Sequence, residues 1–359
     1  MSNLHEEKRL LDIAGAGTPE RLRTIREEEQ NRLKAVLSSS PAVELLRELN
    51  QFHERLIVRA IQLAEEEVAR RGLGAPPVPY AYLLFGSGGR REQTMSSDQD
   101  SGLVYEDPSG EAEAERLRHY FQTLGETVVQ FLIRCGYPPC EGNVLASNPE
   151  WCLPVSGWGR KLDGWFEEPS WENVRHLLIV ADGRAVYGDE ALGERWRARF
   201  HRDFSGHPVI ARRMMENTLR HKALVGVFGQ LLTERYGEAA GSLDIKYGAY
   251  IPMVNIFRLL AVRAGIRETS TLGRIRALGA AKRLSAKEVK ESTEAFTLFL
   301  KLRLLAVEKD EQGQWTGTGR FPANRLTKEE KSPLKKALKL ARKLQRQLEG
   351  EMRYRFGGR

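Results

Sequence analysis

Residues 83–105 read LLFGSGGRREQTMSSDQDSGLVY, and this stretch decides how the central part of the chain folds. An apolar strand ends at Phe85, a turn of small residues follows, and a second apolar strand runs from Asp100 to Tyr105. Successive side chains of a strand point to opposite faces, so we expect Asp98 and Asp100 to point the same way. Two carboxylates on one face repel each other unless a cation lies between them.

The turn and the paired acids together predict a type of chemistry. Hard cations such as Mg²⁺ take oxygen ligands and usually bind together with substrate phosphates. Gly86, Gly88 and Gly89 let the backbone approach an anion closely, and the Ser87 hydroxyl can hold a phosphate oxygen. A phosphate cradle beside a cation site is typical of phosphoryl or nucleotidyl transfer. The sequence has no Gly-x-x-x-x-Gly-Lys-Ser/Thr motif, which excludes a P-loop enzyme.

This arrangement resembles the nucleotidyltransferase superfamily of DNA polymerase beta, in which Gly-Ser is followed by Asp-x-Asp. Within it the chain is most similar to the protein-PII uridylyltransferases and, closer still, to bacterial nucleotidyltransferase-domain proteins often linked to CBS domains. Those proteins read Gly-Ser-x-Gly-Arg-x-Glu-Gln-Thr and then Asp-Gln-Asp, and residues 86–100 supply every element. The later segments that carry the resemblance are residues 140–151, 182–189, 244–248 and 269–274.

The resemblance implies roles for particular residues. It assigns catalysis to Asp98, Asp100 and Ser87, the metal (Mg²⁺ or Mn²⁺) to the two aspartates, and nucleotide binding to Gly86, Ser87, Arg90 and Glu92. An arginine near a triphosphate can grip its oxygens in a bidentate manner. A surface arginine paired with Glu92 is an equally good interpretation of Arg90, and both stay open.

Polymerase-type sites often place a third carboxylate on a later strand, where it can activate the attacking hydroxyl. The strand expected at residues 143–146 carries no acid. Asp182 matches a family segment and could be a metal or base residue, or a structural partner of Arg184. Asp244 and Lys246 belong by resemblance to a helical half that faces the cleft. A helix cap with a solvated lysine is their alternative.

The remaining pattern predicts an α+β protein, in which a small mixed β-sheet core is flanked by an N-terminal helical region and a C-terminal helical bundle. Thr18-Pro19 and Ser40-Pro41 are typical helix starts. The expected helices span residues 18–37, 40–72, 111–135, 214–236, 253–264, 286–307 and 334–348, with mixed turns and helix at 151–187 and a Gly-rich loop at 311–319. The expected domains are residues 1–77 (helical), 78–190 (nucleotidyltransferase) and 191–359 (helical, substrate-binding).

Bulk composition limits the classes of protein. Of the net charge of +8, residues 320–359 contribute +9, from 13 Lys and Arg against 4 Glu, so the rest is near neutral. This basic helix could bind acidic partners, nucleic acid or anionic membrane, or could dock its leucines and leave its lysines solvated. No apolar run reaches the roughly 20 residues that span a bilayer. Three cysteines without a Cys-x-x-Cys pair and a polar N-terminus favour a cytoplasmic protein.

The sequence therefore predicts an enzyme in which an acceptor hydroxyl attacks the α-phosphorus of an NTP and displaces pyrophosphate. By resemblance the acceptor could be a protein, as for PII in the uridylyltransferases. Neither a His-Asp hydrolase pair nor a CBS repeat occurs in the sequence, so we expect no deuridylylation and no built-in ligand sensor. One alternative is a non-catalytic, nucleotide-binding protein of signal transduction. Another is a transferase directed to RNA by the basic helix.

Overall fold

The computed structural model describes residues 2–37, 40–205, 208–218, 224, 230–234, 236–237, 239–311 and 315–356. The chain divides into two compact units. We call the first the sheet unit, which comprises Met1–Ser40, Arg47–Gly164 and Gly183–Phe200. We call the second the helical unit, which comprises Pro41–Leu46, Trp165–Asp182 and His201–Arg359. Each unit is described by itself.

The sheet unit contains one mixed four-stranded sheet in the order β3-β2-β1-β4. Its strands are β1 (Tyr80–Leu84), β2 (Ser101–Tyr105), β3 (Cys152–Pro154) and β4 (Arg184–Gly188). Strand β1 is antiparallel to β2 and β4, whereas β2 is parallel to β3. Every residue of β1 and β2 is buried, which explains why their sequences do not alternate between apolar and polar residues; Ser101 is a buried polar residue at the start of β2.

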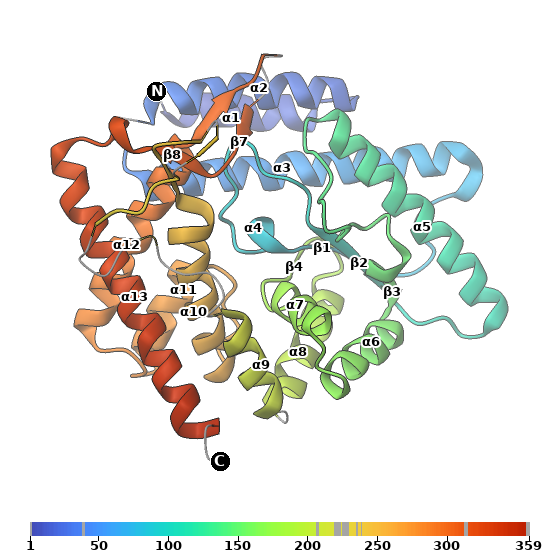
Figure 1. The fold of residues 1–359 in the computed structure, drawn as a ribbon. Helices are drawn as coiled ribbons and strands as arrows, with labels where there is room; N and C mark the ends of the chain where they lie inside the picture. Colours follow the sequence, from blue (N-terminus) through green and yellow to red (C-terminus); the bar gives the residue numbers. More distant parts are fainter. Residues whose placement is uncertain are drawn as a thin grey trace. The chain divides into compact units, whose positions relative to one another are not determined.

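Helices cover this sheet (Figure 1). They are α1 (Ser2–Ala14), α2 (Pro19–Val36), α3 (Ala42–Val68) with the π turn η1 (Ala69–Leu73), α4 (Gly86–Gly89), α5 (Glu111–Arg134) and η2 (Pro149–Trp151). The Thr18 hydroxyl accepts the Arg21 N–H and caps α2, as its sequence predicted. The apolar face of α3 joins β1, β2 and α5 in one core, with Leu56, Ala60 and Val68 fully buried. Helix α6 (Val155–Glu167) begins after β3.

The helical unit consists mainly of helices and two short ribbons of strands. The helices are α7 (Trp171–Val180), α9 (Pro208–Thr218), α10 (Ile251–Arg263), α11 (Thr271–Ala280), α12 (Ala286–Leu305) and α13 (Lys328–Phe356), and α8 (Glu190–Ser205) starts in the sheet unit. Between them lie the π turn η3 (Lys246–Tyr250), the 3-10 turn η4 (Ala323–Arg325), and β5 (Ser242–Asp244), β6 (Val307–Lys309), β7 (Trp315–Gly317) and β8 (Arg320–Pro322). Strand β5 pairs with β8, and β6 pairs with β7.

The predicted fold class is confirmed, and most predicted helices lie within a few residues of the observed ones. Four predictions were wrong. Residues 143–146 form no strand; the third strand is Cys152–Pro154. The stretch 151–187 contains β3 and most of β4, and the described part of the C-terminal region contains four strands besides its helices. Of the helix expected at 214–236, residues 214–218 are helical and belong to α9, whereas residues 224 and 230–234 are not helical. Residues 219–223, 225–229 and 235 of that prediction lie outside the described residues.

Two further expectations concern the whole chain. Cys135, Cys140 and Cys152 are free thiols. Among the residues that the structure describes, none of the helices combines the length and the apolar character needed to cross a lipid bilayer.

Candidate nucleotide and metal site

The register of the β1–β2 pair brings the glycine turn against the second aspartate. Leu84 pairs with Ser101, and the next residue, Phe85, donates its N–H to the Asp100 carbonyl at 2.9 Å. Gly86 follows with φ of +50°, and a Cβ built on it would lie 2.0 Å from Asp100 Oδ2. The Asp100 carboxylate therefore lies directly against the Gly86 backbone, so this position has no space for a side chain.

The Asp-Gln-Asp segment shows the alternation that its sequence predicted. Asp98 is exposed, Gln99 is buried and Asp100 is partly buried. The Gln99 amide donates to the carbonyls of Tyr137 at 2.9 Å and Val129 at 3.3 Å, which anchors the centre of the segment to the end of α5. The burial of Gln99 agrees with the greater exposure of the acids on either side of it.

Cys140 is a neighbour of Asp100 that the sequence pattern did not single out. Burial, and then the adjacent Asp100 carboxylate, raise the pKa of the Cys140 thiol to about 12. The thiol consequently stays protonated at neutral pH and can interact with the carboxylate as a weak donor. In the sequence, the only indication of this contact was the position of Cys140 at the start of residues 140–151, a segment that resembles the family.

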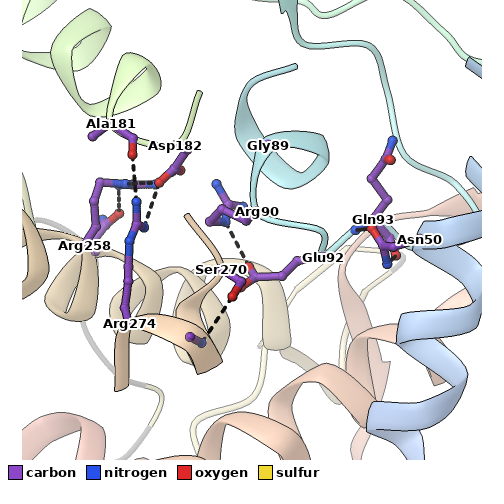
Figure 2. A network of polar contacts seen from close by, with 12 residues as sticks. Asn50, Gly89, Arg90, Glu92, Gln93, Ala181, Asp182, Arg258, Ser270 and Arg274 are labelled. Atoms are coloured by element: carbon purple, nitrogen blue, oxygen red, sulfur yellow. Dashed lines mark hydrogen bonds and ion pairs between the residues drawn. The ribbon is translucent and has the colours of Figure 1, made fainter. Parts of the chain in front are cut away.

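Arg90 and Glu92 form a buried ion pair, with Arg90 Nε 2.9 Å from Glu92 Oε2 (Figure 2). Their side chains are only 6% and 3% exposed, so the pair is not the surface pair that one interpretation expected. The Glu92 N–H also donates to the Ser87 carbonyl at 2.8 Å, which closes the turn around Ser87. Arg90, Glu92 and Ser87 therefore lie close together, and the charge of Arg90 is partly balanced by Glu92.

Helix α3 supports the end of the turn from behind. Asn50 accepts the Gln93 N–H at 2.8 Å and donates to the Gln93 carbonyl at 3.2 Å (Figure 2). His53 Nε2 contacts the Thr94 carbonyl at 3.2 Å, and its Nδ1 contacts the Tyr137 hydroxyl at 2.6 Å. These partners assign the proton to Nε2. Burial, and then Arg26, lower the pKa of His53 to about 3, so the ring is neutral at physiological pH.

Helix α2 binds the next residue of the same segment. Arg26 and Gln30 both donate to the Met95 carbonyl, at 3.0 and 2.6 Å. Residues 90–99 lie outside regular helix and strand, so their buried backbone groups need such partners. The N-terminal helices supply them, which makes these helices part of the structure that holds the turn.

Asp182 lies in the helical unit and is surrounded by arginines. Arg258 reaches both of its oxygens, with Nε at 2.9 Å and Nη2 at 2.5 Å, and Arg274 Nη1 lies 2.8 Å from Oδ1 (Figure 2). Arg274 also donates to the Ala181 carbonyl at 2.8 Å. Asp182 is 1% exposed, and the expected partner Arg184 pairs instead with Glu54 of α3. The arrangement is that of a buried structural carboxylate.

Asp244 and Lys246 also lie in the helical unit. Asp244 Oδ1 accepts the Tyr247 N–H at 2.8 Å, which is the geometry of a cap at the start of η3. Lys246 is partly buried and places its Nζ 5.3 Å from the centre of the Tyr247 ring. The capping interpretation thus accounts for the contacts of Asp244.

A divalent cation fits the Asp98–Asp100 segment in charge and in ligand chemistry, because carboxylate oxygens are its preferred ligands. The third strand, β3, carries no acid, and Glu150 just before it pairs with Lys161. In the part of the chain that the structure describes, no three His, Cys, Asp or Glu side chains are grouped to hold a metal. A cation here would thus need further ligands from the phosphates of a nucleotide or from water.

Comparison with known families adds two matches. The family model described as "Putative nucleotidyltransferase DUF294" matches residues 29–172, which include the glycine turn and both aspartates. The model described as "Putative nucleotidyltransferase substrate binding domain" matches residues 208–352, which lie in the helical unit. The two matches follow one another along the chain and leave residues 1–28, 173–207 and 353–359 uncovered. A comparison with curated proteins found no match.

Proposed function

The chain belongs to the putative nucleotidyltransferase DUF294 family, and on this premise we propose that it moves a nucleoside monophosphate from an NTP to an acceptor hydroxyl and releases pyrophosphate. The general activity, nucleotidyl transfer, is that of the family. The observation that supports our assignment of the site is the contact of the Asp100 carboxylate with the Gly86 backbone. It places a carboxylate beside a turn that can approach phosphate closely.

Several residues of the sheet unit would take part in this transfer, each with its own role. Asp98 and Asp100 would hold Mg²⁺ or Mn²⁺, which when bound neutralises phosphate charge and favours in-line displacement. Gly86 leaves room for the Asp100 carboxylate beside the turn, and the Ser87 hydroxyl can donate a hydrogen bond to a phosphate oxygen. Arg90, held by Glu92, adds positive charge near the turn. The acceptor oxygen attacks the α-phosphorus, the bond to the bridging oxygen breaks, and the proton of the hydroxyl passes to solvent or to a nearby base.

We further propose that the acceptor is a protein hydroxyl and that the chain is uridylyltransferase-like. This rests on the resemblance of residues 86–100 to the protein-PII uridylyltransferases. Mass spectrometry of cell-extract proteins after reaction with each of the four NTPs tests it. A protein that gains the mass of one nucleoside monophosphate supports the proposal, whereas transfer only to RNA or to small molecules would contradict it.

The catalytic roles are tested by the double variant Asp98→Asn/Asp100→Asn. We expect Mg²⁺-dependent release of pyrophosphate from NTPs to fall to background while the urea unfolding midpoint stays close to that of the unmodified chain. Glu141→Gln, which alters an exposed acid in a neighbouring loop, is the matched control and should keep full activity. Transfer that survives in the double variant would refute these roles.

A second candidate is a non-catalytic protein that binds a nucleotide and signals through its helices. The absence of an acid from the described strand β3 favours it, since polymerase-type sites often carry a third carboxylate there. Equilibrium binding of Mg²⁺ and NTPs, measured beside pyrophosphate release, separates the two candidates. Nucleotide binding without any pyrophosphate, with every acceptor fraction tried, would favour the regulator.

A further inference from the structure

Arg184, the first residue of β4, reaches across to the carbonyl end of the glycine turn. Its Nε donates to the Gly89 carbonyl at 3.1 Å, and its Nη2 donates to the Gly88 carbonyl at 3.0 Å. The side chain is 8% exposed. Because β4 pairs with β1, and β1 leads into the turn, the sheet fixes the distance that this side chain spans. One planar guanidinium therefore holds two successive peptide groups of the turn.

Glu54 of α3 completes this arrangement. Its Oε1 accepts Arg184 Nη2 at 2.5 Å and Arg91 Nε at 2.9 Å. Arg91, which occupies the variable position of the family motif, has a positive φ of 56°, so the chain leaves the turn in a constrained backbone conformation. Glu54 thus connects α3 both to Arg184 and to the residue that ends the turn.

The energetics favour a fixed conformation. Burial lowers the pKa of Arg184 to about 10, and the Glu54 carboxylate counters part of this effect, so the guanidinium stays charged at neutral pH. A buried guanidinium is stable only when its donors are satisfied. Arg184 gives the buried Gly89 carbonyl a hydrogen-bond donor, and it adds a second donor to the Gly88 carbonyl, which also accepts the Arg91 N–H at 3.2 Å. Loss of Arg184 therefore weakens the hydrogen bonding of both buried carbonyls.

We propose that Arg184 and Glu54 are positioning residues that hold the Gly88–Gly89 peptides so that the turn is already shaped for the phosphates of the NTP. The proposal rests on the proposed function for its nucleotide, but the holding of the turn does not depend on it. Within the described part of the chain, Arg184 donates to carbonyl oxygens and to Glu54, so its effect on the nucleotide is exerted through the turn. The hydrogen bonds from Arg184 thereby hold the two adjacent glycines, which are flexible by themselves, in one backbone geometry.

Hydrogen exchange of residues 86–94 in the nucleotide-free chain tests the holding of the turn. The variants are Arg184→Gln, Arg184→Lys and Glu54→Gln, and Arg195→Gln, which removes an exposed pair with Glu106, is the matched control. We expect exchange in this segment to rise about 10- to 100-fold in Arg184→Gln, as for loss of hydrogen bonds from a charged donor. Arg184→Lys should recover little, because an ammonium cannot reproduce the planar fork. Arg195→Gln should exchange like the unmodified chain.

The affinity for NTPs tests whether the turn held by Arg184 contributes to nucleotide binding. We expect Arg184→Gln and Glu54→Gln to raise the KM for the NTP by a larger factor than they lower kcat, while Arg195→Gln changes neither. Should Arg184→Gln fail to fold, Glu54→Gln and Arg184→Lys carry the same test. Unchanged exchange in residues 86–94 would overturn the proposal, and so would faster exchange with an unaltered NTP affinity. If the unmodified chain bound no NTP, the proposed function would fail, and the exchange rates would still decide whether Arg184 holds the turn.

Discussion

Two regions of the chain place an aspartate among polar groups, but they use it differently. Around Asp182 the neighbours are charged and buried, and two guanidiniums occupy both carboxylate oxygens. Around the glycine turn, the side chains of Asn50, His53 and Gln30, together with the guanidiniums of Arg26 and Arg184, bind backbone groups, while Asp98 remains exposed. The comparison indicates that the first carboxylate stabilises its unit, and that the second region is built so that its acids remain accessible to a ligand.

Among the changes that test this comparison, Asp182→Asn is expected to have the largest effect. It leaves Arg258 and Arg274 buried without their counter-charge, and removal of one partner of a buried ion pair costs about 3–5 kcal/mol. We therefore expect the urea midpoint of the helical unit to fall strongly. Asp98→Asn, by contrast, should change the free energy of unfolding by about 0.5 kcal/mol or less, as at other exposed sites. If Asp182→Asn unfolded normally but lost transfer, Asp182 would be a site residue and our distinction would be wrong.

The second prediction concerns the glycines of the turn. Gly86→Ala places a Cβ against Asp100 Oδ2 and forces an L side chain to a φ of +50°, so the carboxylate or the turn has to move. We expect transfer to fall about a hundredfold, as for a misplacement of about 1 Å at a reactive site. Gly17→Ala is the matched control, because a Cβ built there would meet nothing within 4 Å and the residue lies outside the turn. Equal activity of the two variants would remove the Gly86–Asp100 contact from the mechanism.

Much of this turn could be predicted from the sequence, for a physical reason. Strands β1 and β2 are buried and rich in apolar residues, and their antiparallel pairing brings Gly86, which follows β1, near Asp100, which precedes β2. The alternation in exposure of Asp98, Gln99 and Asp100 is what an extended chain predicts, although β2 itself begins only at Ser101. These features are local, and local pattern determines them.

The rest depends on partners far away in the chain, which no local pattern reveals. Arg258 and Arg274 lie 76 and 92 residues from Asp182, so the cluster could not be distinguished from a metal site. Strands of three residues, such as β3, are too short to show a period. Nothing in the local pattern indicated that Asn50 and His53 of α3 support the turn, because a polar residue on a helix is usually at the surface.

The third prediction uses pH to separate the two regions. His53 is neutral in the folded sheet unit, where its pKa is about 3, and ordinary, near 6.5, in the unfolded chain. Between these values the unfolded chain binds the extra proton, so stability falls as pH falls below 6.5. The loss should be about 2 kcal/mol between about pH 7 and pH 5.

Urea unfolding at the two pH values, compared between the unmodified chain and His53→Gln, measures this loss. The variant keeps an amide that can reach the Thr94 carbonyl but has no proton to bind, so its own loss should be about 2 kcal/mol smaller. A transition assigned to the helical unit should be the same in both proteins. Identical pH dependence of the sheet unit in both proteins would show that His53 does not remain neutral.

The smallest effect is expected from the basic helix α13. Its Leu334, Leu338 and Leu348 are buried, so deletion of the helix would expose apolar surface and could not test its charge alone. Lys336, Lys339 and Lys343 are exposed. Their replacement by Gln should change stability by about 0.5 kcal/mol or less and leave pyrophosphate release unaltered.

An RNA-directed transferase makes the opposite prediction, because each lysine that contacts a phosphate adds to a salt-dependent affinity. RNA binding that weakens steeply with salt, and that this triple variant abolishes, would assign α13 to an acceptor nucleic acid. If RNA binding is the same in the triple variant and the unmodified chain, the lysines are solvated surface residues. The packing of the buried leucines then accounts for the helix.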